Sequence, residues 1–164
     1  MSTGVQIKVL RLFNDKFLIG VTGVIFNENH EVLLLKHSYR RVMWSLPGGY
    51  LQSNEHPKKG LQREIFEETN FKVFIEKIVK TSHDKNSARL DMCYVGTFKS
   101  GKFKKSHEVT DFKFHAVKNL PKLIDDQYKQ IDLAYEQYKH LHAFPFFKKI
   151  TNLFSFSKNK SHKT

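Results

Sequence analysis

Three glutamates, Glu64, Glu67 and Glu68, lie close together in a segment that predicts a helix. At about 100° per residue, their carboxylates fall within one arc of about 100° on the helix surface. Like charges at these spacings repel by about 0.2–0.5 kcal/mol per pair, and the negative end of the helix dipole adds to this penalty. Carboxylate oxygens are preferred ligands of Mg²⁺ and Mn²⁺, and such an ion would remove the repulsion. The trio therefore indicates either a divalent metal site or a solvated acidic face.

The residues on either side of the trio favour the metal site. Gly49 precedes the helix, and a glycine there lets the backbone approach a ligand and offer its carbonyl oxygen. Arg63 offsets only part of the negative charge of the trio. Seven specified positions within 20 residues follow the pattern G-x5-E-x7-R-E-U-x-E-E, in which U is apolar: Gly49, Glu55, Arg63, Glu64, Ile65, Glu67 and Glu68.

This pattern resembles the Nudix box, the signature of hydrolases that act on a nucleoside diphosphate linked to another moiety. Asn70 stands where the box usually has a glycine, and asparagine also tolerates the left-handed backbone conformation. The resemblance extends to about residues 16–120 and includes the lead-in W-x-L-P-G-G over residues 44–49. It implies an α/β/α sandwich around a mixed sheet and a hydrolase that cleaves a pyrophosphate bond in a nucleotide-type substrate.

The resemblance also implies a role for each residue of the pattern. The acidic trio and the carbonyl oxygen of Gly49 are implied as ligands of Mg²⁺, with Mn²⁺ as the alternative. Glu55 and Arg63 resemble the structural pair that holds the loop against the helix and orients the acids.

The implied chemistry is substitution at phosphorus by water, in which a carboxylate removes a proton from the water. Glu64 and Glu67 are the candidate catalytic carboxylates on the helix. Glu108, at the end of a lysine-rich loop, is a further candidate, because Nudix enzymes often place there a glutamate that contacts a metal or acts as the base. The alternative for Glu108 is an exposed loop acid.

Four residues outside the pattern are candidates for binding the substrate. Arg40 or Arg41 can hold a phosphate bidentately, Tyr39 can stack on a base, and Arg89 can reach the same site from a predicted strand. Ordinary surface charge is the alternative. Three substrate classes stay open: nucleoside triphosphates, diphosphate-linked sugars or alcohols, and the 5′-triphosphate ends of RNA. A non-catalytic Nudix domain that senses nucleotides or binds a partner is the alternative function.

The chain is basic, which favours a polyanionic partner such as a nucleotide, RNA or anionic lipid. Its 28 Lys and Arg residues against 16 Asp and Glu give a net charge of +12. The single cysteine, Cys93, excludes an intramolecular disulfide and a cysteine zinc site. The longest apolar run, over 17–26, is about half the length of a membrane span, and we expect no secretory signal. These features predict a cytoplasmic protein.

Apolar periodicity predicts an α/β or α+β fold in which helices cover a mixed sheet. The Nudix-box helix is predicted over Pro57–Thr69, ended by Asn70, and a second helix over 124–142. Pro-Gly-Gly at 47–49 predicts irregular backbone. Strands are predicted over 17–26, 31–36 (returning from the first strand as a hairpin), 71–79, 88–98 and 111–117.

We expect three parts in the chain: an N-terminal element over 1–16, a Nudix domain over 17–143, and a basic aromatic tail over 144–164. The tail is predicted to form a helix that lies on an anionic membrane, which would make the protein peripheral there, or docks on a protein partner. The alternative is that it packs on the domain or on a second copy, as in a dimer. Its apolar stripe consists of Phe146, Phe147, Ile150, Leu153 and Phe154.

Overall fold

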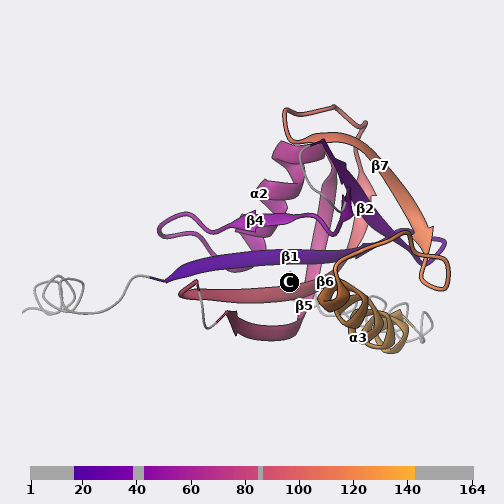
Figure 1. The fold of residues 1–164 in the computed structure, drawn as a ribbon. Coiled ribbons are helices and arrows are strands. Elements are labelled where there is room, and N and C mark those ends of the chain that lie inside the picture. Colours follow the sequence, from indigo (N-terminus) through magenta and orange to yellow (C-terminus); the bar gives the residue numbers. More distant parts are fainter. Residues whose placement is uncertain (1–16, 39–42, 85–86, 143–164) are drawn as a thin grey trace, which may run out of the picture.

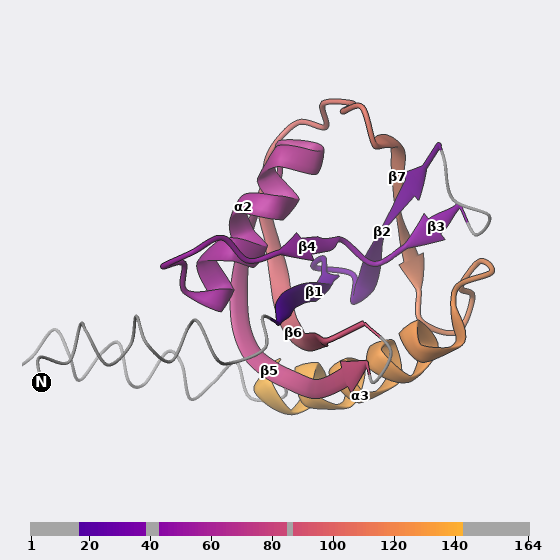
Figure 2. The ribbon, with the colours of Figure 1, turned by 60° about the vertical axis from the view of Figure 1, so that its left-hand side comes forward.

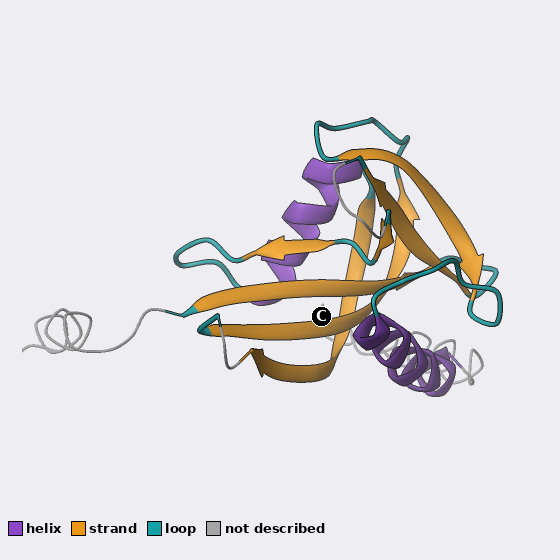
Figure 3. Cartoon of the chain, viewed as in Figure 1, coloured by secondary structure: helices purple, strands orange, loops and turns teal. Residues whose placement is uncertain are grey.

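The computed structural model describes residues 17–38, 43–84 and 87–142, which form a mixed β-sheet with a helix on each face. Figure 1 shows the two helices, α2 and α3, on opposite sides of the sheet, and Figure 3 shows the strands between them. The expected sandwich is therefore confirmed. The N-terminal element over 1–16 and the tail over 144–164 lie outside the described residues, and the division into three parts stays a prediction.

Strand β1 lies at the centre of the sheet. It runs parallel to β6 along its whole length and antiparallel to β4 and β2. The order is β3-β2-β1-β6-β5, with β4 paired to β1 and β7 paired to β2. The seven strands are β1 (Leu18–Phe26), β2 (Glu31–His37), β3 (Trp44–Ser45), β4 (Gly48–Tyr50), β5 (Lys72–Asp84), β6 (Arg89–Ser100) and β7 (Val109–Ala116).

The central strands are apolar on both sides because a helix covers each face of the sheet. Successive strand residues point to opposite faces. In β1, Val21 and Ile25 pack in the cluster under α2 (Pro57–Thr69), whereas Val24 packs in the cluster under α3 (Asp125–His142). A strand buried on both faces reads as a nearly continuous apolar run, as β1 and β2 do.

Helix α2 has the bounds that the sequence predicts, because both of its ends carry suitable residues. The His56 side chain accepts a hydrogen bond from a backbone N–H of the first turn, and Pro57 follows it. Asn70 ends the helix in the left-handed conformation, with φ of 63°. Leu61 and Ile65 are fully buried against the sheet, so the acidic side of the helix faces away from the core.

Helix α3 confirms the predicted second helix, beginning one residue later than expected. Ile131, Ala134 and Tyr138 are buried against the other face of the sheet. Cys93 is buried on this face, where burial raises the pKa of its thiol to about 12. Within the described ranges, neither helix combines the length and the apolarity needed to cross a bilayer.

The predicted hairpin is confirmed only next to its turn, and one other local prediction is wrong. β1 and β2 are antiparallel neighbours, as the predicted hairpin requires, but their ladder is short, with Phe26 opposite Val32, and β2 also pairs along its length with β7. The turn at Asn27 forms as expected, but β1 is already paired with β6 and β4 on its two edges. The irregular backbone predicted over 47–49 is wrong for Gly48 and Gly49, which belong to strand β4 and pair with β1.

Candidate active site

The two glycines before α2 bring the β4 backbone close to β1 and α2. A Cβ atom at Gly48, where φ is 157°, would overlap the carbonyl oxygen of Val21. A Cβ atom at Gly49 would overlap the carboxylate of Glu64. The absence of both side chains therefore lets the Glu64 carboxylate lie directly against the backbone of Gly49.

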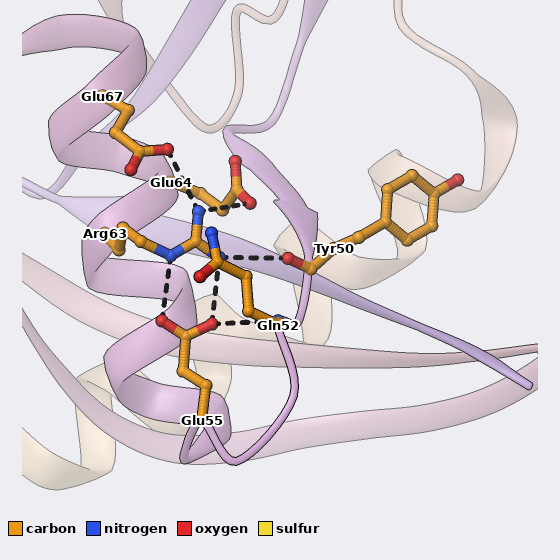
Figure 4. A network of polar contacts seen from close by, with 6 residues as sticks. All are labelled: Tyr50, Gln52, Glu55, Arg63, Glu64 and Glu67. Atoms are coloured by element: carbon orange, nitrogen blue, oxygen red, sulfur yellow. Dashed lines mark hydrogen bonds and ion pairs between the residues drawn. The ribbon is translucent and has the colours of Figure 1, made fainter.

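Arg63 holds the loop between β4 and α2 through Glu55 (Figure 4). Its Nε and Nη2 atoms each donate to a carboxylate oxygen of Glu55 at 2.9 Å, which makes a bidentate ion pair. Nη2 also donates to the backbone carbonyl of Tyr50 at 3.1 Å, and the N–H of Gln52 donates to Glu55 at 3.2 Å. The structure thus brings together the two residues that the sequence pairs as structural support.

The same guanidinium contacts two members of the acidic trio. Nη1 of Arg63 donates to Glu64 at 2.8 Å and to Glu67 at 3.0 Å. The hydrogen bond from Arg63 lowers the pKa of the Glu55 carboxyl. The same hydrogen bond is the main cause that raises the pKa of Arg63. One positive charge is therefore shared by three carboxylates, which offsets part of the repulsion along this side of α2.

The trio spans a gradient of exposure. The Glu67 side chain is 56% exposed and that of Glu64 is 19% exposed, while Oε2 of Glu68 is inaccessible to solvent. Among the residues that the structure describes, no three His, Cys, Asp or Glu side chains are gathered as metal ligands, and Arg63 bridges Glu64 and Glu67. The trio and the carbonyl of Gly49 are nevertheless all hard oxygen donors, which fit Mg²⁺ or Mn²⁺. Their role as metal ligands stays a prediction.

Gly60, inside α2, has a packing role that the sequence did not predict. A Cβ atom there would overlap the side chain of Leu51 and lie 2.8 Å from a carboxylate oxygen of Glu55. The glycine therefore lets the loop before the helix pack against α2. A glycine in a helix interior lowers helix stability by about 1 kcal/mol relative to alanine, and this local conflict was the signal available in the sequence.

The other sequence-predicted site residues lie outside the described residues, on the loop before β7, or at the start of β6. Tyr39, Arg40 and Arg41 fall in the segment 39–42, which the structure does not describe. Glu108 is exposed at the end of the loop that leads into β7. Their proposed roles stay predictions.

Arg89 lies at the start of β6, on the sheet. Its Nε donates to Asp91 at 2.8 Å, and hydrogen bonds with Asp91 and then with Tyr50 raise the pKa of Arg89. Asp91 in turn occupies the space that Gly20 leaves on β1. Arg89 is thus engaged by its neighbours in the sheet, and its role in binding substrate also stays a prediction.

Replacing Gly49 with alanine is expected to lower kcat/KM by about 10–100-fold, because the added methyl group displaces the Glu64 carboxylate and small misplacements are costly in a reacting site. The thermal midpoint should change little, since a flexible side chain can move aside. Gly23→Ala is the control, because its Cβ meets only apolar side-chain atoms, the nearest being 3.1 Å away at Ile25. Equal activity in the two variants would contradict the placement of Glu64.

Residues 16–135 of the sequence match a family model, the NUDIX domain. A MutT-like protein from Streptomyces ambofaciens is 34% identical over 71 residues, which cover 43% of this chain and 44% of that protein. Nudix hydrolase 8 from Arabidopsis thaliana is 29% identical over 79 residues, which cover 46% of this chain and 21% of that protein. The matched segment thus spans less than half the length of either relative.

Solved structures share the fold at low sequence identity. A UDP-X diphosphatase has a TM-score of 0.69 and 22% identity, covering 87% of this chain and 73% of its own. An ADP-ribose pyrophosphatase from Streptococcus suis has a TM-score of 0.66 and 21% identity, covering 74% and 92%. The NUDIX domain of Shewanella oneidensis NrtR, complexed with ADP ribose, has a TM-score of 0.65 and 22% identity, covering 84% and 99%.

Proposed function

The chain belongs to the Nudix family, and from this premise we propose that it is a Mg²⁺-dependent hydrolase that cleaves a pyrophosphate bond in a nucleoside diphosphate-linked compound or a nucleoside triphosphate. Mn²⁺ is the alternative ion, and members of this family generally use a divalent metal. The observation that carries the proposal is the intact acidic trio on one side of α2, with Glu64 against the backbone of Gly49.

In this proposal, the trio and the carbonyl of Gly49 hold the metal. When bound, the metal neutralises phosphate oxygens and lowers the pKa of a bound water. Arg63 positions Glu64 and Glu67 by donating to both, and Glu55 fixes Arg63 through two hydrogen bonds. The chain's own residues therefore supply an ordered set of carboxylates rather than a nucleophile.

The reaction is hydrolysis of a phosphoric anhydride. The oxygen of a water molecule forms a new bond to phosphorus, the bridging P–O bond breaks, and a phosphate group leaves with the bonding electrons. A carboxylate accepts the proton of the water, and Glu67 is the best-placed candidate on α2 because it is the most exposed member of the trio. Glu64 and Glu108 are the other candidates.

The names of the similar proteins define the substrates to test. Those proteins are named for ADP-ribose and for UDP-linked compounds, and one NUDIX domain was crystallised with ADP ribose. We propose compounds of this nucleotide type as substrates. The protein should be assayed with ADP-ribose, UDP-sugars, nucleoside triphosphates and 5′-triphosphorylated RNA, in Mg²⁺ and in Mn²⁺, with phosphate and pyrophosphate measured separately.

Turnover of at least one of these compounds is the expected result. Saturable binding of a nucleotide without turnover of any compound would contradict the enzyme and support a nucleotide-sensing Nudix domain instead. If no compound of the panel is bound or hydrolysed, the hydrolase and the nucleotide-sensing domain are both contradicted.

A further inference from the structure

An exposed phenylalanine and two lysines form a patch on the face of the sheet opposite α2. In β5, Val73 and Ile75 pack in the cluster under α2, so Phe74 between them points to the other face. Phe74 is 54% exposed, and Nζ of Lys99 lies 5.6 Å from the centroid of its ring. Lys72, two residues earlier in the strand, is exposed on the same face. We call Lys72, Phe74 and Lys99 the Phe74 patch.

The end of α3 lies close to the Phe74 patch. Nε2 of His142, the last residue of α3, lies 3.1 Å from Oε1 of Glu76 in β5. The ring of His142 also packs on Tyr138, with a centroid distance of 4.3 Å. Figure 2 shows the last turn of α3, in yellow, beside β5. Glu76 follows Phe74 by two residues, about 7 Å along a strand, so the segment that continues from α3 begins beside the patch.

The patch and the segment after α3 carry charge of the same sign. Within the described ranges, neither Lys72 nor Lys99 forms an ion pair, and Glu76 is engaged by His142. Residues 144–164 contain five lysines and no acidic residue. Like charge makes the patch a poor docking site for that segment, whereas one anionic surface can bind both.

The apolar residues favour a lipid bilayer over a dissolved polyanion. The apolar stripe of the tail contains Ile150 and Leu153, and aliphatic side chains gain from entering the acyl boundary of a bilayer but do not stack on bases. Phe74 lies between lysines, whose methylene stems can lie along apolar material while their ammonium groups reach the headgroups. Stable anchoring takes two signals, and the patch supplies a second one next to the tail.

We propose that the Phe74 patch binds the anionic surface of a lipid bilayer together with residues 144–164. The ring of Phe74 enters the boundary between headgroups and acyl chains, and the ammonium groups of Lys72 and Lys99 contact the lipid phosphates and carboxylates. The acidic side of α2 lies beyond the opposite face of the sheet, away from the negative charge of the lipid. The inference extends to the folded domain the membrane contact that the sequence predicts for the tail, and it does not depend on the proposed hydrolase activity.

The test is co-sedimentation of the full chain with vesicles of phosphatidylcholine and phosphatidylserine, compared with vesicles of phosphatidylcholine alone. The patch variant carries Lys72→Gln, Phe74→Ala and Lys99→Gln. The matched control removes two exposed lysines and an exposed phenylalanine beside or on α2, through Lys102→Gln, Lys104→Gln and Phe66→Ala. Both variants keep residues 144–164 and have the same net charge, and circular dichroism verifies that each is folded.

The patch variant should bind the anionic vesicles at least about tenfold more weakly than the wild-type protein, because each lysine near an anionic leaflet contributes about fivefold. The control variant should bind like the wild-type protein, and vesicles of phosphatidylcholine alone should bind weakly in every case. A tryptophan probe then tests the position of the ring. Emission of the Phe74→Trp protein should shift to shorter wavelength on addition of anionic vesicles, whereas emission of the Phe66→Trp protein should not.

Equal affinities of the patch variant and the control variant for anionic vesicles would overturn the proposal, since the tail or net charge alone would then explain binding. Absence of binding by the wild-type protein would also overturn it. A fluorescent single-stranded RNA provides the remaining comparison: if the patch variant loses affinity for RNA but not for vesicles, the patch binds a nucleic acid and the proposal fails. None of these measurements needs turnover, so their outcome is independent of the proposed hydrolase activity.

Discussion

Replacing Glu67 with glutamine should lower kcat by about 10²–10⁴-fold while leaving the protein folded. The Glu67 side chain is mostly exposed, and it accepts a hydrogen bond from Arg63 at 3.0 Å. Arg63 would still be held by its hydrogen bonds to Glu55 and Glu64 if this one were lost. The fold therefore depends little on its charge. The proposed reaction depends on it strongly, because glutamine is neither a good ligand for Mg²⁺ nor a base.

The measurement is kcat on the best substrate of the panel, together with the thermal midpoint. Glu136→Gln is the matched control, because Glu136 is an exposed helix glutamate that pairs with Lys139 at 2.7 Å, on the far side of the sheet. Comparable rates in the Glu67 variant and the wild-type protein would discard the assignment of Glu67.

Removal of divalent ions should reduce hydrolysis to background, and added Mg²⁺ should restore it. Arg63 supplies one positive charge against the carboxylates of Glu55, Glu64 and Glu67, so a phosphate-bearing substrate would meet excess negative charge in the site. A divalent ion held by these carboxylates would neutralise that excess and allow a phosphate-bearing substrate to bind. The assay compares EDTA-treated protein before and after addition of Mg²⁺ or Mn²⁺.

The same ion should raise the thermal midpoint, since any ligand that binds only the folded state stabilises it, by about 2.7 kcal/mol at a hundred times its Kd. Glu68→Gln should diminish this shift, and Glu136→Gln should not. Full activity in EDTA, or a thermal shift that is unaffected by the Glu68 change, would contradict the metal site.

The helix and its acids could be predicted because helical periodicity fixes which side chains share a face. Pro57 and Asn70 then determine the ends of α2, and the structure has the same bounds. The strand β4 could not be predicted, because it is short, glycine-rich and stabilised by its pairing with β1 rather than by local propensity.

Strand pairings and side-chain contacts between distant parts of the chain could not be predicted from the sequence either. The pairing of β2 with β7 depends on a strand far along the chain, whereas a hairpin with β1 is the local expectation. The simultaneous contacts of Arg63 with Glu64 and Glu67 depend on a side-chain rotamer, which spacing does not specify. The sequence shows Gly60 only as a glycine in a helix interior. Its packing against Leu51 and Glu55 depends on the path of the loop before the helix, which the sequence does not specify.

Strand β5 ends the sheet on one side, and its 13 residues could serve as a template for another copy of the chain. Its irregular register, with shifts after Lys72, Ile75 and Ile78, interrupts the regular ladder that amyloid-like growth needs. Lys77 adds an exposed positive charge along the same strand. The shifts and the charge together protect this long outer strand against edge-to-edge pairing with another copy of the chain.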